Sequence, residues 1–312
     1  MLASDDRPAV WQHTCAPMPV IMTFSERLRL RKSIWWGSPG GWRNRSTWHR
    51  PVHRWLDRVR LRDRSWPLER WCCCDQWQRC LNNKWNAREF AALHGVALPE
   101  LYWSGRRVDD LPINDLPDNY VIRPAWGAGG LETFVMAGGV ELLSLQRMSR
   151  SEVIERLRKK VGSVARFPIL AEQFLANEQG HYERGVEYTF YVFGDRVGLV
   201  QQILRTGQQG IRTTYHPDWT VFRDARGEED AFNAKRAGPL SRPRPASLDE
   251  MLDIARTLGS AYATFVRVDL YATAQGCYFG EFSSIPFDGK GYTPAADSFL
   301  GRLWEETFPD RI

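Results

Sequence analysis

The chain has 312 residues, of which 43% are hydrophobic, and this is enough to build a substantial core in one or two domains. No run of 18 apolar residues occurs, and acidic residues stand near the start, where a signal peptide would need an apolar stretch. These features argue against a helical membrane protein. They predict a soluble, cytoplasmic one whose six cysteines are reduced thiols.

The net charge of +5 conceals an asymmetry along the chain. Residues 23 to 81 hold 14 Lys or Arg against five acids, so this segment alone carries a surplus of nine positive charges. Ten of the 14 tryptophans also occur by Trp85, many of them beside arginines. This mixture predicts binding to an anionic polymer or membrane surface, without a specific nucleic-acid site. The alternative is a poorly packed, partly disordered leader.

Ordinary helix and strand patterns begin near residue 81, where we place the main domain boundary. In chain order they predict a helix from Asn82 or Asn83 to Gly95, strands at 96–103, 120–124 and 131–136, a helix at 149–161, and a strand at 167–172.

The second half of the chain is predicted in the same way. Its patterns indicate a hairpin of 187–193 and 196–204, loops at 205–246, a helix at 247–259, a second hairpin of 265–271 and 277–283, and a final helix at 295–306. Ser149 with Glu152, and Ser247 with Glu250, are expected to form capping boxes at the starts of two of these helices.

A glycine-rich loop follows the strand at 120–124. Gly127, Gly129 and Gly130 supply free backbone N–H groups that can close over a polyphosphate. The loop is neither a Walker loop nor a Rossmann turn, because no Gly-Lys-Ser or Gly-Lys-Thr run occurs in it and no helix follows at once. Such a loop alone is more often an ordinary hairpin. Arg123 strengthens the case, because a cation on the strand can reach a phosphate under the loop.

The strongest chemical pattern lies on the predicted hairpin near the C-terminus. Arg267, Asp269 and Tyr271 alternate along one strand, and Glu281 and Ser283 alternate along its partner. Strand alternation places two carboxylates and a cation on one surface. This arrangement suits Mg²⁺, which binds through one or two protein carboxylates plus substrate phosphates. The alternative is an exposed ion pair on a solvated sheet face.

Five segments occur in the order and spacing found in ATP-grasp enzymes. They are Lys84 after Asn83, YVIRPAWGAGG, ILAEQFL, GVEYTFYVF, and RVDLY followed by YFGEFSSIPFDG. Over residues 81 to 308 the chain resembles D-alanine ligase, and especially the teichuronopeptide-biosynthesis (TupA-like) branch of the ATP-grasp superfamily. Each motif alone is weak, but five in order are specific.

The resemblance implies an α+β fold in which two antiparallel-sheet subdomains clamp ATP. Residues 81–165 would form the small subdomain with the glycine loop. Residues 166–312 would form the large subdomain with the hinge and the metal site. The basic, tryptophan-rich segment of residues 1–80 would precede both, and it shows no match to the first domain of many ATP-grasp ligases.

The resemblance also implies a role for each site residue. Those expected to bind ATP are Lys84 and Arg123 on the phosphates, Gly127, Gly129 and Gly130 as the phosphate loop, Glu172 and Leu175 at the adenine hinge, and Glu187 near the ribose. The expected Mg²⁺ ligands are Asp269 and Glu281, with Ser283 as a weaker ligand where relatives have asparagine. Arg267 would be catalytic, steadying charge on the transferred phosphoryl group and on the tetrahedral intermediate.

The implied reaction joins a carboxylate to an amine through an acyl phosphate and releases ADP. Its substrates would be small or polymer-linked, and the pathway would be cell-surface polysaccharide or peptide-polymer synthesis. Two alternatives stay open: an ATP-grasp kinase that phosphorylates a hydroxyl, and a polyanion-binding module with a decayed ATP site. The intact set of Arg267, Asp269 and Glu281 speaks against decay.

Overall fold

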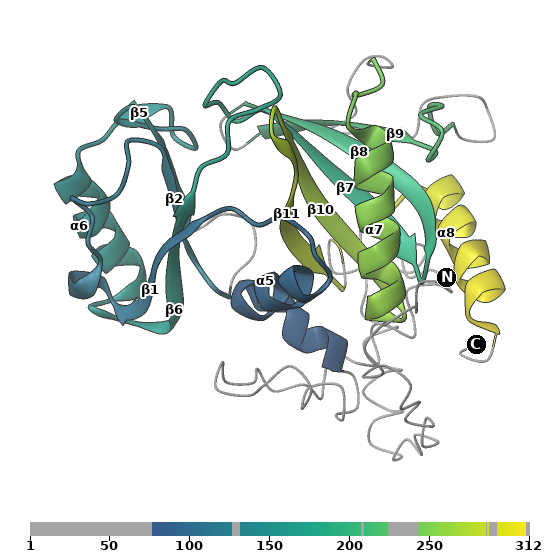
Figure 1. Ribbon diagram of the computed structural model, residues 1–312, viewed down its shortest axis with the longest axis horizontal. Coiled ribbons are helices and arrows are strands. Elements are labelled where there is room, and N and C mark those ends of the chain that lie inside the picture. The colour runs from purple at the N-terminus through teal and green to yellow at the C-terminus, as the bar shows by residue number, and fades with distance from the viewer. Residues whose placement is uncertain are drawn as a thin grey trace, which may run out of the picture.

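The computed structural model describes residues 77–126, 132–206, 209–223, 243–284, 286 and 292–309. Two antiparallel sheets dominate this part of the chain, one at each end of the molecule, and helices pack on both (Figure 1). The glycine loop and most of the basic segment, residues 1–76, lie outside the described residues. Within the described part, no helix has the length and apolarity that crossing a membrane needs.

The first sheet has six strands in the order β1-β6-β2-β3-β4-β5. Their bounds are Leu101–Arg107 for β1, Tyr120–Pro124 for β2, Phe134–Ala137 for β3, Val140–Glu141 for β4, Gln146–Arg147 for β5 and Val164–Gln173 for β6. One face is covered by α6 (Arg150–Val161), which buries Val153 and Leu157 against the sheet. A short 3-10 helix, η3 (Val108–Asp110), follows β1. Because β6 belongs to this sheet, the predicted subdomain division after residue 165 falls inside a strand.

The second sheet has five strands in the order β11-β10-β7-β8-β9. Their bounds are Val186–Phe193 for β7, Arg196–Thr206 for β8, Gln209–Tyr215 for β9, Phe265–Thr273 for β10 and Gly276–Ser283 for β11. Two helices pack on this sheet, α7 (Leu248–Tyr262) and α8 (Pro294–Thr307).

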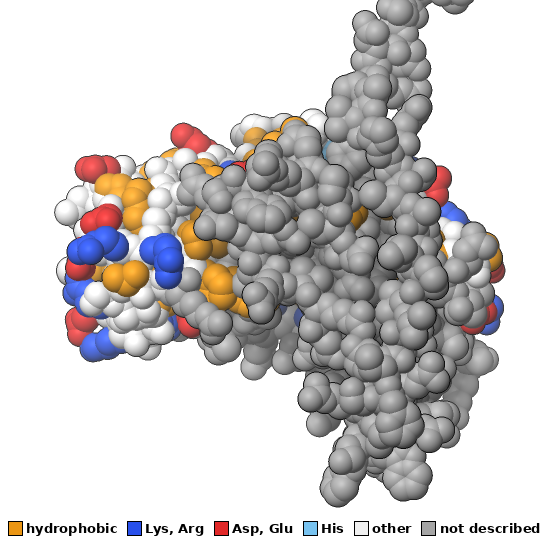
Figure 2. All heavy atoms as spheres, turned by 90° about the horizontal axis from the view of Figure 1, so that it is seen from below, with side chains coloured by type: hydrophobic (Ala, Val, Ile, Leu, Met, Phe, Trp, Pro, Cys, Tyr) orange, Lys and Arg blue, Asp and Glu red, His pale blue; other side chains and the backbone are white. Residues whose placement is uncertain are grey.

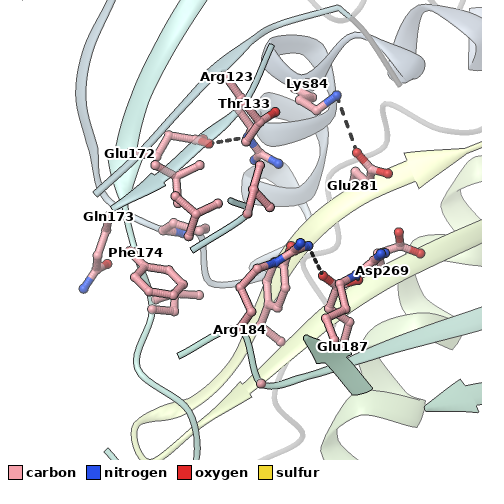
Figure 3. A pocket seen from close by; sticks show the side chains of 18 of the residues that line it. Lys84, Arg123, Thr133, Glu172, Gln173, Phe174, Arg184, Glu187, Asp269 and Glu281 are labelled. Carbon is pink, nitrogen blue, oxygen red and sulfur yellow. Dashed lines mark hydrogen bonds and ion pairs between the residues drawn. The ribbon is translucent and has the colours of Figure 1, made fainter. Parts of the chain in front are cut away.

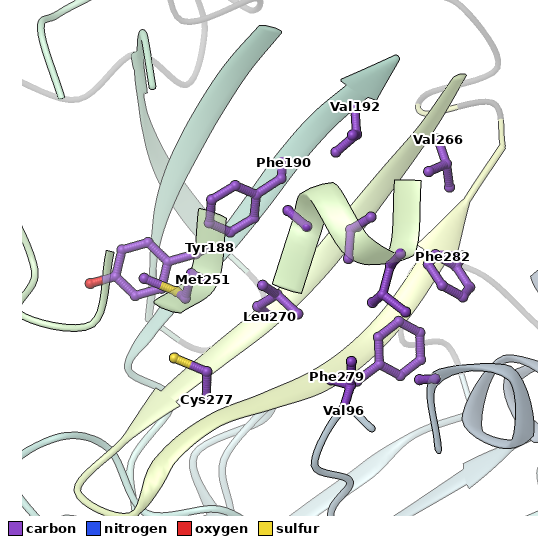
Figure 4. Close-up of a cluster of buried hydrophobic side chains, with 14 of the residues drawn as sticks. Val96, Tyr188, Phe190, Val192, Met251, Val266, Leu270, Cys277, Phe279 and Phe282 are labelled. Atoms are coloured by element: carbon purple, nitrogen blue, oxygen red, sulfur yellow. The ribbon is translucent and has the colours of Figure 1, made fainter. Parts of the chain in front are cut away.

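The two faces of the second sheet are covered differently. One face carries the main core, in which Phe190 and Leu270 pack against α7 (Figure 4). On the other face, the end near Phe193 is covered by α8, which contributes Trp304 to a second apolar cluster. The remainder of that face is polar and turns toward the first sheet.

Helix α5 (Lys84–Leu93) and the preceding 3-10 helix η2 (Trp77–Asn82) connect the two sheets (Figure 1). Phe90 packs against Phe282 of the second sheet, with ring centroids 5.8 Å apart. The backbone N–H of Lys84 donates to the carbonyl oxygen of Ala125, just after β2, at 2.7 Å. One short helix therefore contacts both halves of the molecule.

Charged side chains of both signs are intermixed at the first-sheet end of the molecule (Figure 2). Several form exposed ion pairs, such as Lys159 with Glu155 at 2.5 Å and Arg150 with Asp118 at 3.3 Å. Exposed pairs of this kind contribute little to stability. The face seen in Figure 2 carries hydrophobic side chains among these charges.

Most predicted elements are confirmed, including both hairpins and the helix capped by Asn83. The capping box of Ser149 and Glu152 is confirmed, but that of Ser247 and Glu250 is wrong. The Ser247 hydroxyl instead donates to Glu178 at 3.0 Å, and Glu250 accepts from the backbone N–H of Cys277 at 3.1 Å. Tertiary partners have replaced the local cap.

Several other boundaries differ from the prediction. The expected strand at 96–103 lies later, as β1, and the region 205–246, predicted as loops, contains strand β9. The helix expected to end at Gly259 continues to Tyr262 as α7. Ala263 provides the left-handed residue that ends it, with φ of 61°.

Candidate active site

A cavity of about 700 Å³ lies between the two sheets. Strands of both sheets and the segment after β6 line it, so side chains far apart in sequence face each other (Figure 3). Its size is typical of a site for a small molecule or cofactor. One wall of the cavity belongs to the second sheet and the facing wall to the first sheet.

Arg267, Asp269 and Glu281 form a compact group on that second-sheet wall. Asp269 and Glu281 are cross-strand partners on β10 and β11. The Arg267 guanidinium donates to both Asp269 oxygens, from Nε to Oδ1 at 2.7 Å and from Nη2 to Oδ2 at 2.6 Å. Its Nη2 also donates to Glu281 Oε1 at 3.3 Å. The predicted sharing of one sheet face by these three residues is confirmed.

Lys84 reaches this group from α5. Its Nζ lies 3.5 Å from Glu281 Oε2, so the first-turn lysine of the helix meets a carboxylate of the second sheet (Figure 3). Asn83 fixes the start of α5, and with it the position of Lys84. Its side chain accepts from the backbone N–H groups of Trp85 and Asn86 and so caps the helix.

The pKa values of Asp269 and Glu281 are shifted in opposite directions. Burial raises the pKa of Asp269 to about 7, despite the opposing attraction of Arg267. Burial would also raise the pKa of Glu281, but the positive charges of Lys84, Arg267 and Arg123 outweigh it and hold the pKa below its usual range. Adjacent carboxyl groups with separated pKa values are frequent in functional sites.

These donors fit a magnesium ion that is shared with phosphates. Among the described residues, no group of three or more His, Cys, Asp or Glu side chains could hold an ion alone. Asp269 and Glu281 nevertheless offer paired oxygen ligands, and Mg²⁺ commonly uses one or two carboxylates together with substrate phosphates and water. Ser283 is the cross-strand partner of Arg267 but does not line the cavity.

On the first-sheet wall, Glu172 holds two arginines. Its side chain is 2% exposed; Oε1 accepts from Arg88 Nη1 and Oε2 accepts from Arg123 Nε, both at 2.6 Å. Burial would lower the pKa of Arg123, but Glu172 more than compensates and raises it, so the guanidinium stays charged in the cavity wall. Leu175 lies in the same wall, within the segment after β6.

Glu187, at the start of β7, also pairs with two arginines. Its Oε1 accepts from Arg184 Nη2 at 3.3 Å, and its Oε2 lies 2.7 Å from Arg205 Nε. The structure thus places Lys84, Arg123, Glu172, Leu175, Glu187, Arg267, Asp269 and Glu281 around one cavity. Gly127, Gly129 and Gly130, predicted as the phosphate loop, lie outside the described residues.

Four arginines of this site were not predicted from the sequence. Arg88, Arg184, Arg205 and Arg212 all belong to the cavity wall or to its ion pairs. Strand alternation could have indicated two of them, because Arg205 and Arg212 share the face of the second sheet that carries Glu187 and Asp269. Strand alternation could not have indicated Arg88, because its partner, Glu172, is 84 residues away in the sequence.

Comparison with known families decides what kind of protein carries this cavity. The family model described as TupA-like ATP-grasp matches residues 75–304, which includes both sheets. The chain belongs to the TupA-like ATP-grasp family. The predicted α+β fold with two antiparallel sheets is confirmed by this match together with the observed topology.

Solved structures of ATP-grasp enzymes are also similar to this family member. D-alanine–D-alanine ligase from Bacillus anthracis is 16% identical, with a TM-score of 0.48 over 75% of this chain and 70% of that one. ATP-grasp ligase PsnB, complexed with a precursor variant, Mg and ADP, is 14% identical, with a TM-score of 0.43 over 75% and 60%. L-amino acid ligase from Bacillus licheniformis is 16% identical, with a TM-score of 0.41 over 68% and 42%. No curated protein matches the chain.

Proposed function

We propose that this protein is an ATP-dependent ligase that joins a carboxylate to an amine through an acyl phosphate. The observation that carries the proposal is the group of Arg267, Asp269 and Glu281 on one wall of the cavity, opposite Arg123 on the other. The chain's membership of an ATP-grasp family supports ATP as the phosphoryl donor. The acid, the amine and a role in polysaccharide or peptide-polymer synthesis are part of the proposal.

In this proposal the nucleotide spans the cavity. The segment after β6, which contains Leu175, would receive the adenine at its backbone, while Glu187 would face the ribose. Lys84 and Arg123 would contact the phosphates. Glu172 would act on the nucleotide through the arginines that it holds, because its two oxygens already accept from Arg88 and Arg123.

Asp269 and Glu281 would hold Mg²⁺, with Ser283 as a weaker additional ligand. When bound, the ion would supply positive charge to the phosphate oxygens, the usual contribution of Mg²⁺ to phosphoryl transfer. Arg267 now occupies both oxygens of Asp269, so its guanidinium fork must share that carboxylate or turn toward the transferred group. Either arrangement keeps a cation beside the developing negative charge.

The chemical step needs little covalent help from the protein. An oxygen of the acid attacks the γ-phosphorus, the bond to the bridging oxygen breaks, and ADP leaves. The amine nitrogen then attacks the acyl carbon, loses its proton to solvent, and inorganic phosphate leaves. The protein contributes by holding the reactants together and by placing Lys84, Arg123 and Arg267 where charge accumulates.

Hydroxylamine trapping tests this reaction class. The protein is incubated with MgATP, hydroxylamine and individual amino acids or sugar acids, and both hydroxamate and ADP are measured. We expect both to form together with the correct acid and to be lost in Arg267→Gln. Arg256→Gln, on the exposed side of α7, removes the same charge and should retain both products. A phosphate ester that hydroxylamine leaves intact would contradict the proposal and favour a kinase.

A further inference from the structure

The polar face of the second sheet carries a hydroxyl group beside one of the expected magnesium ligands. Thr189 of β7 is the direct cross-strand partner of Asp269 on β10. Side chains of such partners share one face of a sheet, with Cβ atoms about 4.5–5.5 Å apart. Both residues line the cavity between the two sheets. The side chain of Thr189 is therefore a direct neighbour of the Asp269 carboxyl group.

The Thr189 hydroxyl has no hydrogen-bond partner within the part of the chain that the structure describes. The residue is 1% exposed, so bulk water does not replace the missing partner. A buried hydroxyl without a partner costs free energy, whereas valine has a similar shape and also favours strands. The fold alone therefore does not explain why residue 189 is a threonine.

Polar side chains on the other side of Thr189 are paired with one another. Gln201 of β8 is its direct partner there. The Oε1 atom of Gln201 accepts from the Tyr191 hydroxyl at 3.3 Å, and its Nε2 donates to Thr214 Oγ1 at 3.2 Å. This network leaves out the Thr189 hydroxyl. Asp269 is then the neighbour to which Thr189 can donate, because a carboxylate has about four lone-pair sites.

Binding of a magnesium ion would change the partners of Asp269. In the structure, Arg267 donates to both oxygens of this carboxylate, at 2.7 Å and 2.6 Å. An oxygen that coordinates the ion keeps fewer lone pairs for the guanidinium, and Arg267 also has to serve the transferred phosphoryl group. Carboxylates that ligate metals are in turn held by hydrogen bonds, which orient them. Thr189 is a donor that the neighbouring strand already supplies.

We propose that Thr189 is a positioning residue for the magnesium of MgATP: its hydroxyl donates to the Asp269 carboxylate while that carboxylate coordinates the ion. This inference rests on the proposed function, because it takes Asp269 as a magnesium ligand. Rotation about the Cα–Cβ bond of Thr189, between staggered positions, redirects the hydroxyl without moving the strand. The hydroxyl itself contacts neither the nucleotide nor the acid.

The hydroxyl then has different effects in the two states of the protein. In the unliganded fold it is buried without a partner, so its removal should not lower stability. In the complex with MgATP it holds a metal ligand, so its removal should weaken metal binding. A threonine that only supports the sheet would leave metal binding unchanged.

Binding calorimetry with the full chain tests the inference without requiring turnover. A non-hydrolysable ATP analogue is titrated in excess Mg²⁺ and again in EDTA, and the ratio of the two dissociation constants measures the contribution of the ion. Thr189→Val removes the hydroxyl and keeps the branched shape, whereas Thr189→Ser keeps the hydroxyl. Thr264→Val is the matched control. Thr264 is 0% exposed and its hydroxyl also has no partner among the described residues, but it does not line the cavity.

We expect the contribution of Mg²⁺ to fall on the order of tenfold in Thr189→Val. Thr189→Ser and Thr264→Val should keep the ratio of wild type. The affinity for the analogue in EDTA should be the same in all four proteins. Thermal unfolding without ligand should show that Thr189→Val is at least as stable as wild type, because the lost hydroxyl had no partner.

Three outcomes would overturn the inference. They are a wild-type ratio in Thr189→Val, weaker binding of this variant in EDTA, which would assign Thr189 to the nucleotide, and a lower unfolding temperature without ligand, which would assign the hydroxyl to the fold. Should Thr189→Val fail to fold, Thr189→Ala and Thr189→Ser give the same comparison, because they differ only in the hydroxyl. Failure of the proposed function would appear differently, as a wild-type ratio in Asp269→Asn.

Discussion

At the scale of single residues, Glu172 connects three segments of the chain. It lies on β6 and pairs with Arg123 on β2 and with Arg88 on α5. Arg88 also donates from Nη2 to the carbonyl oxygen of Pro99 at 2.7 Å. The carboxylate therefore fixes the helix that carries Lys84 against the wall that carries Arg123. We expect it to matter for both stability and nucleotide binding.

Replacing Glu172 with Gln tests this position. The change leaves two arginines without their shared counter-ion in a place where the carboxylate is 2% exposed, so it should cost about 3 kcal/mol of unfolding free energy. Chemical denaturation measures the loss. Glu155→Gln makes the same change in an exposed pair with Lys159 and should have little effect. Equal stability of the two variants would contradict this account of Glu172.

Local pattern accounts for the sheet face that Arg267, Asp269 and Glu281 share. Arg267, Asp269 and Glu281 follow from strand alternation within one hairpin, so their shared face could be deduced from a short piece of sequence. The partners of Glu172 could not be deduced in the same way. They depend on how β6 meets α5 and β2, which no short segment determines.

At the scale of elements, α7 shows how tertiary packing overrides a local signal. Gly259 was expected to end the helix, but it lies within α7 where the helix touches β7. A Cβ built there would lie 2.3 Å from Val192 Cγ1 and 2.4 Å from the carbonyl oxygen of Gly194. The glycine is present because the helix approaches the sheet closely, not because the chain turns.

Gly259→Ala should therefore destabilise the protein. Higher helix propensity would favour alanine by about 1 kcal/mol, but overpacking against backbone typically costs about 1–3 kcal/mol. We expect a net loss in thermal unfolding, because the backbone oxygen of Gly194 cannot move as a side chain would. Ser260→Ala, on the exposed side of the same helix, is the control. An increase in stability for Gly259→Ala would show that α7 is not packed as described.

Helix α5 gives a prediction for pH. His94 follows its last turn and packs on Phe90, with ring centroids 4.6 Å apart. Burial lowers the pKa of His94 below its ordinary value of 6.5. The unfolded chain then binds the proton more readily than the folded one, so the unfolding free energy should fall as pH drops below 6.5. Thermal unfolding at several pH values measures this slope.

His94→Gln removes the titrating group. The unfolding free energy of this variant should therefore fall less between pH 7 and pH 5 than that of wild type. His181→Gln, which removes an exposed histidine before β7, is measured beside it for comparison. The assignment fails if His94→Gln and wild type lose stability in parallel.

Strand β9 shows a second limit of local pattern. It lies in a polar, proline-containing region that was predicted as loops, although Thr213, Thr214 and Tyr215 are typical strand residues. Its partner β8 supplies the pairing that makes it a strand, from Val200 opposite Tyr215 to Thr206 opposite Gln209. The polar composition of residues 205–246 as a whole concealed the short strand β9. Arg212 was missed for the same reason.

At the scale of the whole molecule, the residues of η2 already pack into the fold. Gln78 and Leu81 pack into the second half, with Gln78 Nε2 donating to the carbonyl oxygen of Tyr262 at 3.1 Å. The family match likewise begins at residue 75. Most of the basic, tryptophan-rich segment thus precedes the ATP-grasp region. That it recruits an anionic polymer or surface stays a prediction.

A shortened chain that begins at Asp75 tests this prediction. It should bind MgATP like the full chain but lose retention on a polyanion column. The full chain should elute as salt rises past about 0.15 M, where screening acts within about 8 Å. A shortened chain that is insoluble, or that cannot bind MgATP, would show that the segment is structural and that the recruitment idea is wrong.

The central claim is that Asp269 and Glu281 hold the magnesium of MgATP in the cavity between the two sheets. Calorimetric titration with MgATP tests it most directly, with wild type, Asp269→Asn, Glu281→Gln and the surface control Glu306→Gln. We predict that wild type and Glu306→Gln bind MgATP alike and that EDTA weakens their binding. The two site variants should bind at least about tenfold more weakly and respond little to EDTA. Unchanged MgATP affinity in both site variants, with unchanged sensitivity to EDTA, would contradict the account.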